Sequence, residues 1–281
     1  MRSQRRSDHD SLTDAGRARR LEEKTAVIFG AGGEVGSAVA KELAAQGAGV
    51  FLSSRTKTRV QELAEAISSR GETAAAAEVD ALDEDAVNSY IDDVVATAGR
   101  IDIIFNAMGP QAVEYRNATS TMELPVETFM LPMRTIVRSQ FITARSAARH
   151  FAREGSGVIV FLMATPSRGL SNTSAIGAAY GAIESLTRSL ATDLSPLGVR
   201  VVCVRSMLMG ETRVGKQTIE TGAEARGAPK EKMAEIITSR PLLRRSPTMA
   251  DTAKVVSFVA SEEANTLTGA IVNSSCGLVL D

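Results

Sequence analysis

Residues 25–36 read TAVIFGAGGEVG, and this stretch decides the fold. The apolar run TAVIF predicts a short buried strand, and the glycines after it predict a tight turn. Residues 37–47, SAVAKELAAQG, repeat apolar side chains at helical spacing and end on a glycine, as many helices do. This strand, turn and helix can bind a pyrophosphate, because loop amides and the positive helix N-terminus point at it.

A glycine cluster alone is weak evidence, and its alternative is a loop without a ligand. Its position between the first strand and the first helix makes the motif much more specific. We therefore predict dinucleotide contacts at Gly30, Gly32, Gly33, Glu34, Val35 and Gly36.

The rest of the chain alternates strands and helices at the same rhythm. Further strands are expected at 49–54, 73–80, 101–109, 157–164, 199–206 and 269–275, and helical patterns lie between them. Such alternation implies right-handed crossovers and a parallel, doubly wound sheet. The fold class is therefore α/β, a Rossmann-type single domain over residues 24–281.

Composition excludes several classes of protein. The net charge is −1, with 44% hydrophobic and 23% charged residues, so nothing favours binding to nucleic acid or to an anionic membrane. No apolar run is long enough to span a bilayer. Two cysteines and two histidines give neither a disulfide framework nor a zinc spacing, so no metal is expected. These features are typical of a cytoplasmic enzyme.

Residues 1–23 differ from the rest, because they carry six arginines and almost no apolar side chains. They lack the apolar stretch of a secretory signal. We expect a disordered extension, with a basic arm that contacts an acidic partner as the alternative.

The end of the second strand indicates which dinucleotide binds. NAD-binding proteins usually place a carboxylate there for the ribose hydroxyls, whereas this chain has Ser54 and Arg55. Arg55 can pair with a 2′-phosphate, which favours NADP(H). The alternative is that Arg55 is a solvated loop cation.

From Lys24 onward the chain resembles the short-chain dehydrogenase/reductase family. Gly30, Gly33 and Gly36 fit its GxxGxxG variant, residues 106–109 (NAMG) resemble its NNAG stretch, and residues 257–277 resemble its C-terminal FLASxxAxxxTG run. The resemblance implies that Asp80 contacts the adenine and Thr212 the nicotinamide carboxamide. It also implies cofactor contacts at Asn106 and Gly109 and a substrate segment at about 210–245.

The family's catalytic residues are a tyrosine, a lysine four residues later, a serine and an asparagine. Anchoring on residues 186–191, LTRSLA, puts Ile176 at the tyrosine position and Tyr180 at the lysine position. The alternative register keeps Tyr180 as the tyrosine and puts Glu184 in place of the lysine. The serine position falls on residues 163–164, next to Thr165, and the asparagine position falls near Ile136.

Either register removes the usual proton relay. Losing a positioned general acid costs about two to four orders of magnitude in rate. Tyr180, which can also contact the cofactor, and Thr165 are the candidate catalytic residues; core packing and a solvated loop are their alternatives. An anionic substrate could bind Arg134, Arg138 or Arg168, although surface helices carry arginines routinely.

Three functions remain open. The first is an NADP(H)-dependent oxidoreductase with a rearranged site, acting on a small organic substrate such as an iminium or an activated alkene. The second is a non-redox isomerase or cyclase, and the third is a catalytically silent NADP-binding protein. The resemblance also implies a homodimer or homotetramer, and Gly177, Ala178, Gly181 and Ala182 would let a partner helix approach closely.

Overall fold

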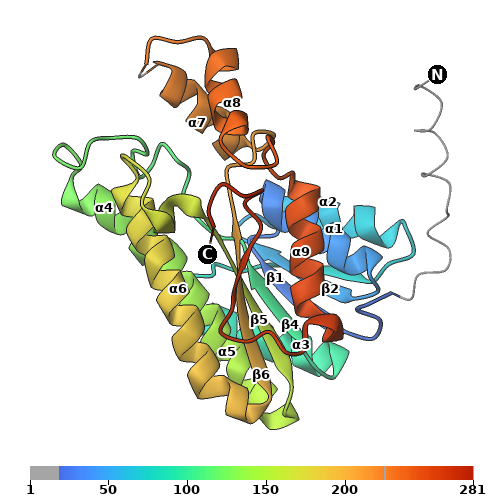
Figure 1. The fold of residues 1–281 in the computed structure, drawn as a ribbon. Helices are drawn as coiled ribbons and strands as arrows, with labels where there is room; N and C mark the ends of the chain where they lie inside the picture. Colours follow the sequence, from blue (N-terminus) through green and yellow to red (C-terminus); the bar gives the residue numbers. More distant parts are fainter. Residues whose placement is uncertain (1–18, 225, 281) are drawn as a thin grey trace, which may run out of the picture.

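The computed structural model describes residues 19–224 and 226–280. Its centre is a seven-stranded sheet in the order β3-β2-β1-β4-β5-β6-β7, and every neighbouring pair of strands is parallel (Figure 1). The strands are β1 (Thr25–Phe29), β2 (Gly49–Ser54), β3 (Ala74–Glu78), β4 (Ile103–Asn106), β5 (Gly157–Ala164), β6 (Val199–Ser206) and β7 (Ile271–Asn273). The predicted doubly wound α/β fold is confirmed.

Helices cover both faces of the sheet. One face carries α1 (Glu34–Ala45), α2 (Lys57–Ser68) and α9 (Met249–Ala260), and the other carries α3 (Glu84–Ala98), α5 (Arg138–Glu154) and α6 (Ser174–Leu194). Side chains of β1 alternate between the two apolar cores, as strand geometry requires: Val27 packs in one and Ile28 in the other. Both faces of the sheet are therefore buried, which explains the continuous apolar strands.

The segments between β4 and α5 and between β6 and α9 lie at the carboxyl end of the sheet. The first contains α4 (Val126–Pro132) and a π-helical turn (Met133–Val137). The second contains α7 (Arg213–Glu224) and α8 (Lys230–Ser239), which project as a helical pair in Figure 1. The predicted substrate segment, residues 210–245, includes this pair.

The described body starts before the expected boundary at Lys24. Leu21 is fully buried, and its amide donates to the carbonyl oxygen of Gln46 at 2.9 Å. Arg20 pairs with Glu263 at 3.3 Å. Residues 1–18, on which most of the expected extension falls, lie outside the described residues. Within the described residues, no helix is both long and apolar enough to cross a membrane.

Candidate active site

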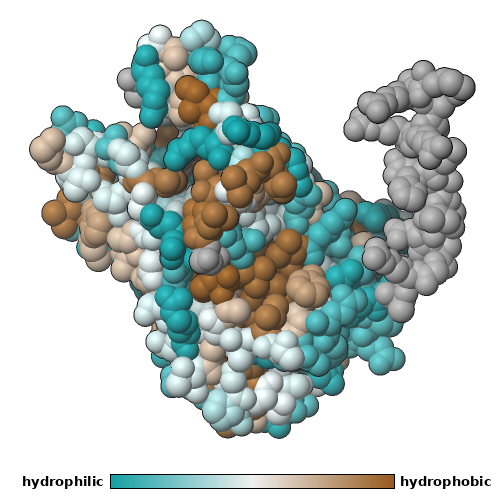
Figure 2. All heavy atoms as spheres, in the orientation of Figure 1, coloured by the Kyte–Doolittle hydropathy of each residue, from teal (hydrophilic) through white to brown (hydrophobic). Residues whose placement is uncertain are grey.

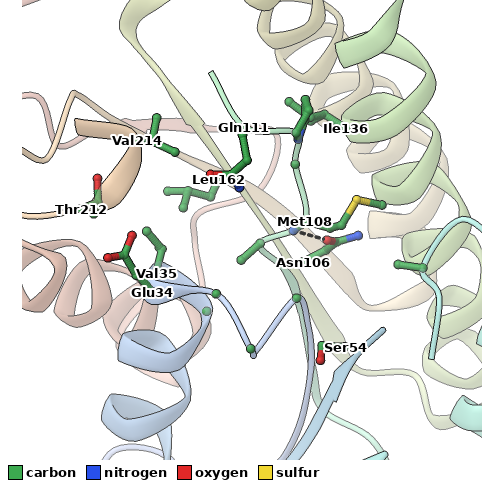
Figure 3. A pocket seen from close by; sticks show the side chains of 18 of the residues that line it. Glu34, Val35, Ser54, Asn106, Met108, Gln111, Ile136, Leu162, Thr212 and Val214 are labelled. Atoms are coloured by element: carbon green, nitrogen blue, oxygen red, sulfur yellow. Dashed lines mark hydrogen bonds between the residues drawn. The ribbon is translucent and has the colours of Figure 1, made fainter. Parts of the chain in front are cut away.

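A pocket of about 400 Å³ opens at the carboxyl ends of the strands (Figure 3). This is where α/β proteins of this topology bind ligands, because the crossovers turn in opposite directions on either side of β1 and β4. All the residues predicted to bind the cofactor line it, namely Gly30, Gly32, Gly33, Glu34, Val35, Gly36, Ser54, Arg55, Asp80, Asn106, Gly109, Tyr180 and Thr212.

The glycine turn is fixed by close backbone packing. Gly30 has a φ of +72°, and a Cβ atom there would lie 2.9 Å from the amide nitrogen of Met108. A Cβ atom at Gly36 would lie 2.4 Å from the carbonyl oxygen of Gly30. Gly33 precedes α1, and no side chain caps that helix. The amides at the start of α1 can therefore donate hydrogen bonds to an anionic group in the pocket.

Glu34 places a carboxylate beside this turn. The side chain is exposed, and its Oε2 accepts a hydrogen bond from the amide of Arg213, the first residue of α7, at 2.7 Å. Glu34 thus links the glycine turn to the substrate segment. The negative charge of Glu34 also disfavours the binding of another anion, such as a pyrophosphate, next to the glycine turn.

The end of the pocket that lies beyond β2 carries two arginines. Ser54 is held by its own loop, since its Oγ donates to the carbonyl of Thr56 and accepts from the amide of Thr56. Arg55 is exposed and lines the pocket, and Arg59 in the first turn of α2 lines it as well. Asp80 lies after β3, where its Oδ1 accepts from the amide of Leu82 at 3.0 Å.

A buried network holds the end of β4. Oδ1 of Asn106 accepts from the amide of Met108 at 2.8 Å, and Nδ2 donates to Oγ1 of Thr143 at 3.3 Å. Nε2 of Gln140 donates to the carbonyl oxygen of Asn106 at 2.8 Å. Asn106 therefore shapes the pocket by fixing the backbone that lines it.

Thr212 organises the other wall. Its hydroxyl donates to the carbonyl of Met209 at 2.8 Å and accepts from the amide of Gly215 at 3.0 Å, as a helix N-cap does. The residue therefore positions the start of α7 at the pocket.

Helix α6 presents Ile176 and Tyr180 to the pocket, whereas Glu184 is not among the lining residues. Glu184 is buried and pairs with Arg205 of β6 at 3.0 Å and with Arg188 at 3.7 Å. Burial opposes its ionisation, but the hydrogen bond from Arg205 and the positive charges of Arg205 and Arg188 lower its pKa overall. Glu184 is therefore held by the helix–sheet interface and is directed away from the site.

Thr165 is not among the residues that line the pocket, although the sequence made it a candidate catalytic residue. It is buried, with 3% of its surface exposed, and Ala164 lines the pocket in its place. Strand β5 ends at Ala164 and a 3₁₀ turn begins at Thr165, so the backbone conformation changes between the two residues. Thr165 thus has no contact with the pocket through which it could act on a substrate.

Burial raises the pKa of all three tyrosines, which are Tyr90, Tyr115 and Tyr180. For Tyr115 the value is about 12, and for Tyr180 the nearby Tyr115 and Cys203 raise the pKa further. Among the described residues that line the pocket, none is a lysine that would counteract this effect. Tyr180 therefore carries a neutral hydroxyl at ordinary pH.

The arginines proposed for an anionic substrate do not line the pocket. Arg134 pairs with Glu127, and Arg138 and Arg168 are exposed elsewhere on the surface. In the described part of the chain, no group of three or more histidine, cysteine or carboxylate side chains could hold a metal ion.

Sequence reasoning missed several lining residues, among them Arg59, Gln111, Tyr115, Gln140 and Met209. Only Arg59 carried a signal, because it is a second arginine shortly after Arg55, in the first turn of α2. The others come from loops and from α5, and only the tertiary fold brings them to the pocket.

Fold and pocket together define a Rossmann-type dinucleotide-binding protein. The family model described as enoyl-(acyl carrier protein) reductase matches residues 30–279. The chain therefore belongs to this branch of the short-chain dehydrogenase/reductase family, and it is an oxidoreductase of that family.

Individual relatives agree with this assignment. The chain is 28% identical to versicolorin reductase of Emericella nidulans over 266 residues, which cover 92% of this chain and 96% of the relative. Its structure resembles sorbitol-6-phosphate 2-dehydrogenase from Erwinia amylovora, with a TM-score of 0.86, 25% identity and coverage of 91% and 100% of the two chains. It also resembles an NAD⁺-bound xylitol dehydrogenase, with a TM-score of 0.84, 25% identity and coverage of 90% and 98%.

Proposed function

We propose that the protein is an NADP(H)-dependent oxidoreductase whose proton-transfer site differs from that of its family. The observation that carries this proposal is the basic end of the pocket. Arg55 and Arg59 line it, and Ser54 stands at the end of β2 where NAD-binding proteins have a carboxylate. A 2′-phosphate would find two cations there and no carboxylate at the end of β2 itself.

The glycine turn and α1 would hold the pyrophosphate, and the wall built by Asn106 and Thr212 would hold the nicotinamide end. When bound, the nicotinamide supplies or accepts a hydride. The chain's own residues orient it and exclude water, because the lining next to Ile176 is apolar.

The position of Glu184 favours the register that puts Tyr180 at the family's lysine and Ile176 at its tyrosine. Ile176 cannot transfer a proton, and a neutral Tyr180 supplies no positive field. Such a site suits a substrate that needs no strong protein acid, such as an iminium or an activated alkene. Tyr180 remains the side chain of α6 that can donate a hydrogen bond in the pocket.

Nucleotide titration tests the cofactor. Charge-assisted hydrogen bonds contribute about 1.5–3 kcal/mol each, so NADPH should bind more than about tenfold more tightly than NADH. Arg55→Ala should remove most of the preference, whereas Arg70→Ala, at an exposed arginine near the end of α2, should leave it intact. Equal affinity of the unmodified protein for both nucleotides would contradict the proposal.

The second candidate is a catalytically silent NADP-binding protein, or a non-redox isomerase or cyclase on the same scaffold. The observation that favours it is Ile176, which places an aliphatic side chain in the pocket at the position of the family's proton donor. Loss of NADPH absorbance with any carbonyl, imine or enone in a panel would exclude it. We further expect a homodimer or homotetramer in the cytoplasm, with no nucleic-acid or membrane partner.

A further inference from the structure

The pocket has a charged end and an uncharged end. Five lining residues are charged, namely Glu34, Arg55, Arg59, Asp80 and Arg213. Four of them follow β1, β2 and β3, which form one half of the sheet, and Arg213 begins α7. Figure 3 shows Ser54 on one side of the pocket and Gln111 and Ile136 on the other. The phosphates and adenosine of the proposed dinucleotide would use the charged end, and its nicotinamide would reach the wall built by Asn106 and Thr212.

The lining over β4, β5, β6 and α6 contains no charged side chain among the described residues apart from Arg213 at its margin. It presents four methionines and two isoleucines, which are Met108, Met163, Met207, Met209, Ile136 and Ile176. Thioether side chains are polarisable and flexible, and they make favourable contacts with aromatic rings. Away from Arg213, an ionised ligand group at this end would lose its hydration without gaining a partner, so of the two substrate types suggested above the uncharged alkene fits this wall and the cationic iminium does not.

Two buried acceptors interrupt this apolar wall. Oε1 of Gln140 and Oε1 of Gln111 have no hydrogen-bond donor among the described residues, and both side chains line the pocket. Gln140 is 2% exposed, and its Nε2 is engaged by the carbonyl of Asn106, which fixes the orientation of the amide. A ligand hydroxyl that reaches this wall would satisfy an acceptor that is otherwise costly to bury.

We propose that the substrate is an uncharged, hydroxylated aromatic compound that binds against the methionines and donates a hydrogen bond to Gln140 or Gln111. Sugar phosphates and carboxylic acids are disfavoured, because Arg134, Arg138 and Arg168 all lie outside the pocket and Arg213 lies only at the margin of this wall. This inference rests on the proposed function, since it assigns only the part of the pocket that would lie beyond the bound nicotinamide.

Calorimetric titration of the full-length protein saturated with NADP⁺ tests the proposal. The matched ligands are 2-naphthol and 2-naphthoate, which share the ring system and differ in the hydroxyl and the carboxylate, with glucose 6-phosphate as a third arm. We expect 2-naphthol to bind at least about tenfold more tightly than 2-naphthoate and glucose 6-phosphate to give no heat. The inference would be overturned if 2-naphthol did not bind, or if 2-naphthoate bound as tightly as 2-naphthol.

Substitutions of single lining residues test where 2-naphthol binds. Gln111→Leu should weaken 2-naphthol about fivefold and leave NADP⁺ affinity unchanged. Gln140→Leu should also weaken 2-naphthol, but NADP⁺ affinity is no control for it, because Gln140 holds the carbonyl oxygen of Asn106 in the cofactor wall. Met209→Glu should abolish 2-naphthol binding, whereas Met122→Glu, at a side chain that is 94% exposed, should not. Full 2-naphthol binding by Met209→Glu would also overturn the inference. Failure of NADP⁺ itself to bind would instead contradict the proposed function.

Discussion

Replacing Glu184 by lysine separates the two registers of the catalytic helix. If Tyr180 were the proton donor, Glu184→Lys would supply the missing lysine and improve carbonyl reduction. In the structure, however, the carboxylate faces Arg205 at 3.0 Å, and the two side chains are 11% and 2% exposed. The substitution would place three positive charges together, because Arg188 lies 3.7 Å from the same carboxylate. We therefore expect it to destabilise the fold.

Removing one partner of a buried ion pair costs about 3–5 kcal/mol, and the added repulsion makes this a lower bound. Domains are stable by about 5–15 kcal/mol, so Glu184→Lys should unfold at a much lower urea concentration or fail to fold. Ser185→Lys, at the exposed neighbouring position, should change the free energy of unfolding by less than about 0.5 kcal/mol. Urea denaturation followed by circular dichroism measures both.

The lowered pKa of Glu184 adds a pH dependence with a definite sign. Its carboxyl titrates below the ordinary value of 4.5 in the folded protein, so the ion pair stabilises the fold above pH 4.5. This contribution is lost as the pH falls through the lowered value. The difference in the free energy of unfolding between the native chain and Glu184→Gln should therefore become smaller in that acidic range. A Glu184→Lys variant that is as stable as the native chain, or that gains carbonyl reductase activity, would refute the reasoning.

Three further outcomes are expected. Because the pKa of every tyrosine is raised by burial, the native protein should show little tyrosinate absorbance at pH 10, whereas the chain in guanidinium should be about half ionised. Stability should then fall above pH 10 by up to about 1.4 kcal/mol per pH unit for each tyrosine, since only the unfolded state releases the proton; stability that stays constant from pH 10 to 11 would contradict this. Glu34→Gln should tighten NADPH binding about three- to tenfold by removing a charge beside the pyrophosphate, with Glu42→Gln on the same helix as the control; weaker binding would show that the carboxylate assists the cofactor. Gly181→Arg should convert the expected dimer or tetramer to a monomer in sedimentation at micromolar concentration, since Gly181 is exposed on α6 with open space around it; a native chain that is already monomeric would exclude the assembly.

Most of the fold could be predicted because its signals are local. The run TAVIF, the glycine turn and the periodic helix lie within 23 residues, and the packing at Gly30 and Gly36 shows why those positions lack side chains. The basic residue at the end of β2 could be found in the same way, since strand ends in a parallel sheet meet at one edge. The start of the described body could not be predicted in this way, because Leu21 is held by a hydrogen bond to Gln46, which is distant in sequence.

The catalytic side of the pocket was harder to predict for a physical reason. Glu184 and Arg205 pair across the interface of α6 and β6, and nothing in either local pattern marks the two as partners. The position of Thr165 depends on where β5 ends, and a shift of one residue reverses the direction of a side chain. Gln140 lies on an apolar helix face, where a lone amide is usually a packing residue.

A crystal structure of the full-length protein with bound NADPH tests the central claim most directly. The account requires Arg55 at the 2′-phosphate, the hydroxyl of Tyr180 within hydrogen-bond reach of the nicotinamide ribose, and Ile176 facing the space next to nicotinamide C4. A structure with the Tyr180 hydroxyl at that space and Glu184 at the ribose, or with no contact between Arg55 and the 2′-phosphate, would contradict it.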